Sequence, residues 1–129
     1  PSTRVKPAIV SNQFNPLHQD RGVAALCRRE GILYQGFFLL GHSNELEHPV
    51  LQRVAASHRV SPAQVVLRWG ISKNVTVLTS SNKPDRIRGN RQLDFELTKE
   101  ELESIDALDG TPWPLPSAPA QGGGTAAVQ

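Results

Sequence analysis

The 129-residue sequence is poor in several residue types, and each shortage excludes a class of protein. The single cysteine, Cys27, excludes an internal disulfide framework and a cysteine-rich zinc site. The longest apolar run, Ile32 to Leu40, is far shorter than the ~20 residues that a membrane span requires. No apolar core typical of a signal peptide follows the first residues, so we expect a cytoplasmic protein without membrane association.

Aromatic residues make up only 5% of the chain, and its basic residues are scattered. A nucleic-acid surface gathers both kinds of residue, so no nucleic-acid partner is expected despite the net charge of +2. The acidic residues are distributed less evenly along the chain, because the segment from Glu96 to Asp109 holds six of the twelve. Such a segment is typical of a solvated helix face.

Short apolar segments alternate with segments that carry helix-start and helix-stop signals. The expected elements are a strand at 8–10, a helix at 20–30, a strand at 32–40, helices from 49 and at 62–72, a strand at 75–78, and helices at 82–91 and from 99. The apolar 32–40 strand is expected to be buried. Asp20 is expected to cap the first helix, and Ile87 to point inward from the helix at 82–91.

Two capping boxes stand out among the helix signals. Ser61 with Gln64 opens one helix, with Pro62 at its first position, and Thr98 with Glu101 opens another. Strands that alternate with such helices predict parallel pairing through right-handed crossovers. The fold class is therefore α/β, with three parallel strands and helices.

A sheet of three parallel strands is small and leaves both edges open. The local pattern fits part of a (β/α)8 TIM barrel, which has eight strands, and it also fits an open doubly wound sheet. Residues 1–110 form one expected domain. The segment 111–129 contains four prolines, three consecutive glycines and no charge, so it predicts a disordered tail rich in Pro, Gly and Ala.

The side chains that could carry other chemistry do not form a convincing site. The four histidines, at positions 18, 42, 48 and 58, lack metal-ligand spacing, so no metal is expected. Cys27 falls on the apolar face of a helix and is interpreted as a small buried residue. Ser11, His18 and Asp20 are the residue types of a hydrolase triad, but no nucleophile elbow surrounds the serine.

Several motifs, in order, resemble the aldo-keto reductase family. They are Lys6-Pro7-Ala8-Ile9-Val10 with Asn15-Pro16-Leu17-His18-Gln19, the run 27–41, Ser61-Pro62-Ala63-Gln64-Val65-Val66-Leu67-Arg68-Trp69, Arg86-Ile87-Arg88-Gly89-Asn90, and the stretch 97–110. The resemblance implies the last three βα units of a barrel that uses NADPH to reduce aldehydes or ketones to alcohols. The family's catalytic Asp, Tyr, Lys and His belong to earlier strands, so no catalytic residue is expected here. Tyr34 is interpreted as a packed strand aromatic.

The resemblance also implies part of a cofactor site. Phe37 matches the aromatic ring that stacks on the nicotinamide, although it could equally be a core residue. Ser81, Arg86 and Asn90 match contacts to the adenosine end, and the guanidinium of Arg86 suits a 2′-phosphate. Asn82 opens the same helix, whose start offers N–H groups. Without the resemblance, Arg86 would be interpreted as a surface arginine.

Four positions depart from the family pattern. Ser11 replaces a Gln that holds the carboxamide, and Ser80 replaces a Lys or Arg that helps to bind the 2′-phosphate. Phe38 replaces a small residue, and Gly89 replaces an acidic or amide residue. We therefore expect NADPH binding by the isolated chain to be weak or absent, and the isolated chain to be inactive.

Two functional classes stay open. The first is the C-terminal fragment of an NADPH-dependent oxidoreductase, completed by the missing N-terminal half of the barrel and acting on a small-molecule carbonyl substrate. The second is a non-catalytic remnant that acts as a binding or interaction module, through its open sheet edges or self-association. The absence of methionine fits either a removed initiator or a piece of a longer protein.

Overall fold

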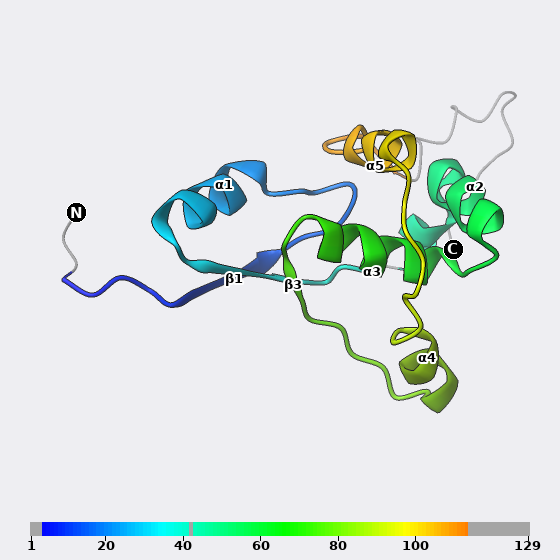
Figure 1. The fold of residues 1–129 in the computed structure, drawn as a ribbon, viewed down its shortest axis with the longest axis horizontal. Helices are drawn as coiled ribbons and strands as arrows, with labels where there is room; N and C mark the ends of the chain where they lie inside the picture. Colours follow the sequence, from blue (N-terminus) through cyan, green and yellow to red (C-terminus); the bar gives the residue numbers. More distant parts are fainter. Residues whose placement is uncertain (1–3, 42, 114–129) are drawn as a thin grey trace, which may run out of the picture.

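A computed structural model describes residues 4–41 and 43–113. Its elements are β1 (Ile9–Gln13), α1 (Arg21–Glu30), β2 (Leu33–Phe37), the 3-10 helix η1 (Ser43–Glu47), α2 (Pro49–His58), α3 (Pro62–Ser72), β3 (Thr76–Val77), α4 (Pro84–Gly89) and α5 (Lys99–Asp106). The predicted order of strands and helices is confirmed (Figure 1). The short helix η1 was not predicted, and β3 contains only two residues.

The three strands form one sheet in the order β1-β2-β3, and both pairs are parallel. Ile9 lies opposite Leu33 and Gln13 opposite Phe37, while Gln35 pairs with Thr76. Successive parallel strands are joined by the helical crossovers that the sequence predicts. The expected α/β class with three parallel strands is confirmed.

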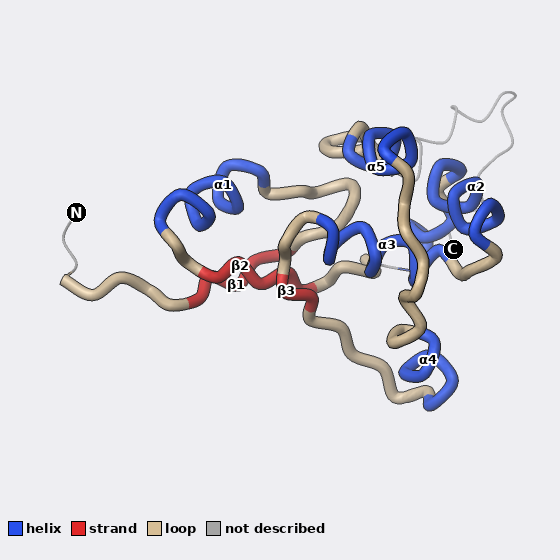
Figure 2. Tube along the Cα trace, in the orientation of Figure 1, coloured by secondary structure: helices blue, strands red, loops and turns tan. Residues whose placement is uncertain are grey.

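Helices lie against only one face of this sheet. Tyr34 and Gly36 point to the covered face and are buried, whereas the alternate residues of β2, Leu33 and Phe37, are 47% and 41% exposed. Figure 2 shows α1 on one side of the three strands, with the opposite side uncovered by the described part of the chain. The prediction of a fully buried 32–40 strand is therefore wrong, because side chains alternate between a covered and an open face.

The covered face is closed by aromatic packing. The ring of Trp69, from α3, stacks on Phe14 just beyond β1, with the ring centroids 5.0 Å apart and an interplanar angle of 9°. The ring of Tyr34 packs edge-on against the ring of Phe14, with the two centroids 5.8 Å apart. Trp69 is fully buried and Phe14 is nearly so. These contacts hold α3 against the sheet.

Asp106, the last residue of α5, joins this helix to the body of the protein. Its carboxylate accepts a hydrogen bond from the Trp69 indole at 2.8 Å and forms an ion pair with Lys73. The buried amide of Gln19 donates to the backbone oxygens of Ile105 and Asp106 at 3.2 and 3.1 Å. The C-terminal end of α5 is thereby bound both to α3 and to the loop between β1 and α1.

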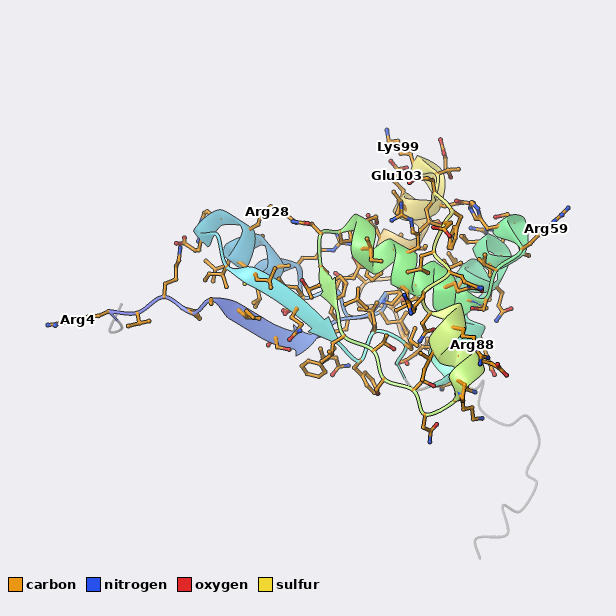
Figure 3. The ribbon with its side chains drawn as sticks, turned by 60° about the horizontal axis from the view of Figure 1, so that its bottom comes forward. Arg4, Arg28, Arg59, Arg88, Lys99 and Glu103 are labelled. Carbon is orange, nitrogen blue, oxygen red and sulfur yellow. The ribbon has the colours of Figure 1, made fainter. Side chains whose placement is uncertain are left out.

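The acidic segment 96–109 is only partly the solvated face that the sequence predicts. Lys99 and Glu103 form an exposed i,i+4 pair, and Figure 3 shows both side chains extending away from the body. Glu101, by contrast, reaches α2 and contacts the His58 ring at 2.7 Å. Burial alone would raise the pKa of Glu101, but hydrogen bonds from His58, the Thr98 amide and Ser57 outweigh it and hold this pKa below its usual value.

Both predicted capping boxes are confirmed, one from Ser61 to Gln64 and one from Thr98 to Glu101. The prediction for Asp20 is wrong. It precedes α1 with φ of 45° and makes no side-chain cap, because its carboxylate instead accepts hydrogen bonds from Tyr34 and Asn12 at 2.7 and 2.9 Å.

The inward orientation expected for Ile87 is also wrong, since this side chain is 47% exposed. The reason is that α4 buries none of its residues. In Figure 1 this helix stands apart from the other helices, between two extended connections. Its apolar side chain therefore has no core to enter.

Part of the predicted tail lies outside the described residues, so disorder in 114–129 stays a prediction. Within the described part, the indole of Trp113 donates to the backbone oxygen of Asn44 at 2.7 Å, and its ring lies 4.8 Å from that of His48. The described helices include none that is long and apolar enough to cross a membrane.

The packing of Gly36 generates the first prediction. A Cβ atom at this position would lie 3.0 Å from both the Phe14 Cβ and the Val75 Cγ1, within the closed layer between sheet and helices. We expect Gly36→Ala to lower the free energy of unfolding by about 1–3 kcal/mol through overpacking. Gly22→Ala is the control, because nothing lies within 4 Å of that Cβ. It should leave stability unchanged or raise it by up to about 1 kcal/mol. Urea unfolding followed by tryptophan fluorescence measures both changes, and equal effects would contradict the packing.

Candidate functional site

Two cavities adjoin at the C-terminal ends of β2 and β3. One, of about 430 Å³, is lined by Phe37, Phe38, Leu78 and their neighbours. The other, of about 700 Å³, lies between the start of α3 and α4. Leu40, Gly41 and Ser80 line both cavities, which therefore adjoin, and the two together are called the trough. The C-terminal ends of parallel strands are where α/β folds place their ligands.

The wall of the trough beyond β2 is a strained turn. Phe38 has φ of 61°, in the left-handed region that bulky residues rarely adopt. The Gly41 amide closes the turn by donating to the Phe38 oxygen at 3.1 Å. Gly41 itself has φ of 60°, and a Cβ there would lie only 1.5 Å from a carboxylate oxygen of Glu45. The positive φ favours glycine at this position, whereas the Glu45 carboxylate is the end of a flexible side chain and could move away from a Cβ.

The larger cavity brings together four of the seven residues that the sequence assigned to a cofactor, namely Ser80, Ser81, Arg86 and Asn90. They come from the loop after β3 and from α4 with its C-cap. Phe37 lines the adjoining cavity, so a flat aromatic face lies at one end of the trough and a guanidinium at the other.

Ser11 and Asn82 line neither cavity. Ser11 lies on β1, opposite Gln35, on the same open face of the sheet as Phe37. Asn82 is exposed, two residues before α4 begins at Pro84. The Lys83 amide is already used by the Ser81 hydroxyl, at 3.2 Å. The helix start therefore offers fewer free N–H groups than the sequence suggests.

Among the described residues, Arg86 forms no ion pair within the protein. Its neighbour Arg88 does, because its guanidinium contacts Asp85 at 2.7 Å. Figure 3 shows Arg88 on α4, at the side of the molecule away from β1. Arg86 is thus the arginine of α4 that lines the cavity without an ion pair, although the carboxylate of Asp85, which Arg88 contacts, lines the same cavity. Such a group can bind an anion without first breaking a protein contact.

Tyr34 lies on the opposite side of the sheet from the trough. Its ring is buried on the helix-covered face, and its hydroxyl donates to Asp20 at 2.7 Å. Burial raises the pKa of Tyr34, and the hydrogen bond to the Asp20 carboxylate raises it further. A general acid of a reductase requires the opposite shift and access to the ligand. The interpretation of Tyr34 as a packed aromatic is confirmed.

A separate cavity of about 300 Å³ lies on the covered side, between α1 and α3. Its polar lining is occupied by internal bonds, since Asp106 holds both Trp69 and Lys73 and Arg21 donates to Gln19. It therefore fits a gap in helix packing better than a ligand site.

None of the described histidines lines the trough, and each of them has a structural partner. His48 caps α2 by accepting from the Val50 amide at 3.2 Å, and His58 contacts Glu101. His18 pairs with Asn15 in a tight turn after β1. His42 lies outside the described residues. Cys27 is 1% exposed, as predicted for a packed side chain.

Comparison with known proteins identifies the family of this chain. Residues 42–110 match the sequence model of the aldo/keto reductase family. The chain belongs to the aldo-keto reductase family. An uncharacterised oxidoreductase of Bacillus subtilis, YtbE, is 32% identical over 109 residues, which cover 84% of this chain and 39% of that protein. A 9,11-endoperoxide prostaglandin H2 reductase of Trypanosoma cruzi is 34% identical and covers 84% of this chain and 40% of its own length.

Solved aldo-keto reductases agree with the fold. The chain superimposes on a mutant of Gox0644, solved in complex with NADPH, with a TM-score of 0.80 and 26% identity, covering 84% of this chain and 40% of the other. An aldo/keto reductase from Brucella melitensis gives a TM-score of 0.76 at 30% identity, covering 81% and 40%. The chain thus spans about 40% of the length of these relatives, and its three parallel strands correspond to part of an aldo-keto reductase barrel.

Sequence reasoning missed several contributors to the trough, among them Gln64, Leu46 and Asp85. From the sequence, Gln64 was assigned only to its capping box. That role uses the side-chain oxygen but not the NH2 group. A glutamine rather than a glutamate at that position is the signal that could have shown it, because only an amide can also donate. Leu46 belongs to η1, and nothing in the sequence predicted this helix.

The burial of Tyr34 generates the second prediction. The chain contains one tyrosine, so the absorbance of phenolate reports Tyr34 alone. We expect this signal to stay absent well above the ordinary tyrosine pKa of ~10 until the protein unfolds. Because the folded-state pKa is raised, the stability contributed by Tyr34 is fully present below ~10 and is lost as pH rises toward the folded-state value.

Tyr34→Phe should remove this alkaline dependence and should lower stability by about 1.5 kcal/mol at neutral pH, since a hydrogen bond to a charged group is lost. Urea unfolding at several pH values measures both effects. A Tyr34 that titrates in the folded protein at or below its ordinary pKa would contradict the placement.

Proposed function

We propose that this chain forms the cofactor-binding wall of an NADPH-dependent oxidoreductase that reduces aldehydes or ketones to alcohols. The observation that carries the proposal is the trough running from Phe37 to Arg86. Phe37 would stack on the nicotinamide, Arg86 would bind the 2′-phosphate, and Ser81 and Asn90 would contact the adenosine. The NADPH complex of Gox0644 and the names of the xylose reductases that resemble this chain support this cofactor.

Several features weaken the site. A hydroxyl at Ser80 carries no charge for the 2′-phosphate, and Ser11 is too short to hold a carboxamide as a glutamine would. Each missing charged hydrogen bond costs about 1.5–3 kcal/mol of affinity. The open face of the sheet also leaves Phe37 in water. NADPH binding by this chain alone is therefore weak.

By itself the chain does not reduce carbonyls. When bound, NADPH supplies the hydride, but the forming alkoxide needs a proton from a positioned acid. Tyr34 cannot supply it, because it lies on the covered face with a raised pKa. In this proposal the acid and the rest of the substrate pocket would come from a part of the barrel outside this chain, which covers about 40% of its relatives' length.

A second candidate function is a non-catalytic interaction module. The observation that favours it is the uncovered apolar face, where Ile9, Leu33 and Leu78 are 52%, 47% and 52% exposed. Within residues 4–41 and 43–113, both outer strands of the three-stranded sheet also have an unpaired edge, at β1 and at β3. The partner would then be another chain that covers this face, or a second copy of this one.

The third prediction tests the proposed cofactor. Arg86→Ala should reduce the affinity for NADPH by about 10–100-fold and leave that for NADH unchanged, since only NADPH carries the 2′-phosphate. Arg91→Ala is the control, because Arg91 lies just beyond α4, is exposed and does not line the cavity, and its loss leaves Asp85 paired with Arg88. Titration of each cofactor by calorimetry gives the affinities. Equal affinity of the unaltered chain for NADPH and NADH would contradict the proposal.

A further inference from the structure

The helix that carries Arg86 places none of its residues in the core. None of the residues of α4 is buried, and Ile87 is 47% exposed. Most helices of a protein are held by an apolar stripe. The position of α4, and with it that of Arg86, therefore depends on what holds the ends of the helix, namely the packing of Leu93 against the core and the polar bonds at the residues just before Leu93.

Gln64 supplies such bonds from the first turn of α3. Its Nε2 donates to the backbone oxygens of Gly89 and Gln92, at 3.1 and 2.9 Å. These two oxygens flank Asn90, the C-cap of α4. These hydrogen bonds hold the C-terminal end of α4, one turn from Arg86. The Gln64 side chain also lines the cavity.

The other end of the same side chain is fixed as well. The Oε1 atom accepts a hydrogen bond from the Ser61 amide at 2.8 Å, within the capping box of α3. Both N–H groups and the oxygen of the amide are therefore engaged, which leaves the side chain little freedom. Val65, Val66 and Trp69 of α3 are buried in the core. The hydrogen bonds of Gln64 therefore attach α4 to a helix that is itself firmly packed.

We propose that Gln64 is a positioning residue that sets the preference for a 2′-phosphorylated cofactor by holding α4 and Arg86 against the trough. This role rests on the proposed function, in which Arg86 binds that phosphate. Gln64 does not need to touch the cofactor. It acts through Arg86, because a loosened α4 would no longer hold the guanidinium at one wall of the cavity.

Two variants separate this role from the capping of α3. Gln64→Glu keeps an oxygen for the Ser61 amide, so the capping box stays, but a carboxylate cannot donate to the oxygens of Gly89 and Gln92. Ser61→Ala does the reverse, removing the hydroxyl of the box while Gln64 can still bind α4. Because Gln64→Glu also adds a negative charge to the cavity that Arg86 lines, the uncharged Gln64→Met, which has a similar size and no donor, decides whether loss of the bonds to α4 is the cause.

The fourth prediction concerns these variants, measured by hydrogen exchange of the amides at 87–92 and by the ratio of NADPH to NADH affinity. Gln64→Glu and Gln64→Met should speed exchange in this segment by about tenfold or more, and should bring the affinity ratio close to one. Ser61→Ala should lower the melting temperature while leaving exchange at 87–92 and the affinity ratio as in the unaltered chain.

The outcomes distinguish the two proposals. A chain that shows no preference for NADPH before any substitution overturns the proposed function, whatever the exchange of α4. If the unaltered chain prefers NADPH and Gln64→Glu keeps this preference, or keeps the slow exchange at 87–92, the role of Gln64 is overturned. An equal loss of preference in Ser61→Ala would also overturn it, because α3 capping would then be the cause.

Discussion

The stacking of Trp69 on Phe14 determines which face of the sheet the helices cover. Once α3 lies on that face, Tyr34 and Gly36 are enclosed with it, and the alternate residues of the strands must point to the other side. That other side carries Ser11 and Phe37, together with the exposed apolar residues Leu33 and Leu78. In a closed barrel such a face becomes the interior, which explains why a chain of this length leaves it open.

The same arrangement divides the chain into a rigid part and a part held by polar bonds. Asp106 closes the rigid part, because its carboxylate binds Trp69 and Lys73 and fixes α5 to α3. The trough lies at the margin of this part, with Phe37 on the sheet and Arg86 on α4. Its aromatic end is therefore positioned by packing, and its cationic end by the amide of Gln64.

Local sequence signals were sufficient where a short-range interaction determines the structure. Both capping boxes depend on residues three apart, so Ser61 with Gln64 and Thr98 with Glu101 could be predicted. The prediction for Asp20 failed because Tyr34 and Asn12, which are distant in sequence, compete for its carboxylate. The prediction that Ile87 points inward failed for a related reason. Its apolar side chain indicated contact with the core, but α4 does not reach the core.

The candidate site could be predicted only through family resemblance. Composition and spacing alone would have left Arg86 as a surface arginine and Phe37 as a core residue. The structure adds what spacing cannot give, namely that four of the predicted residues share one cavity and that Ser11 and Asn82 do not line it. The second role of Gln64 depends on contacts 25 and 28 residues away along the chain, which no local pattern indicates.

The central claim is that this chain is a barrel wall with an uncovered interior face, and sedimentation velocity tests it most directly. We expect the unaltered chain to self-associate as its concentration rises, because apolar side chains and two strand edges are open. A double variant, Leu33→Lys with Leu78→Lys, places charges on that face only and should sediment as a smaller species. An unaltered chain that sediments as a compact monomer and melts cooperatively would contradict the account.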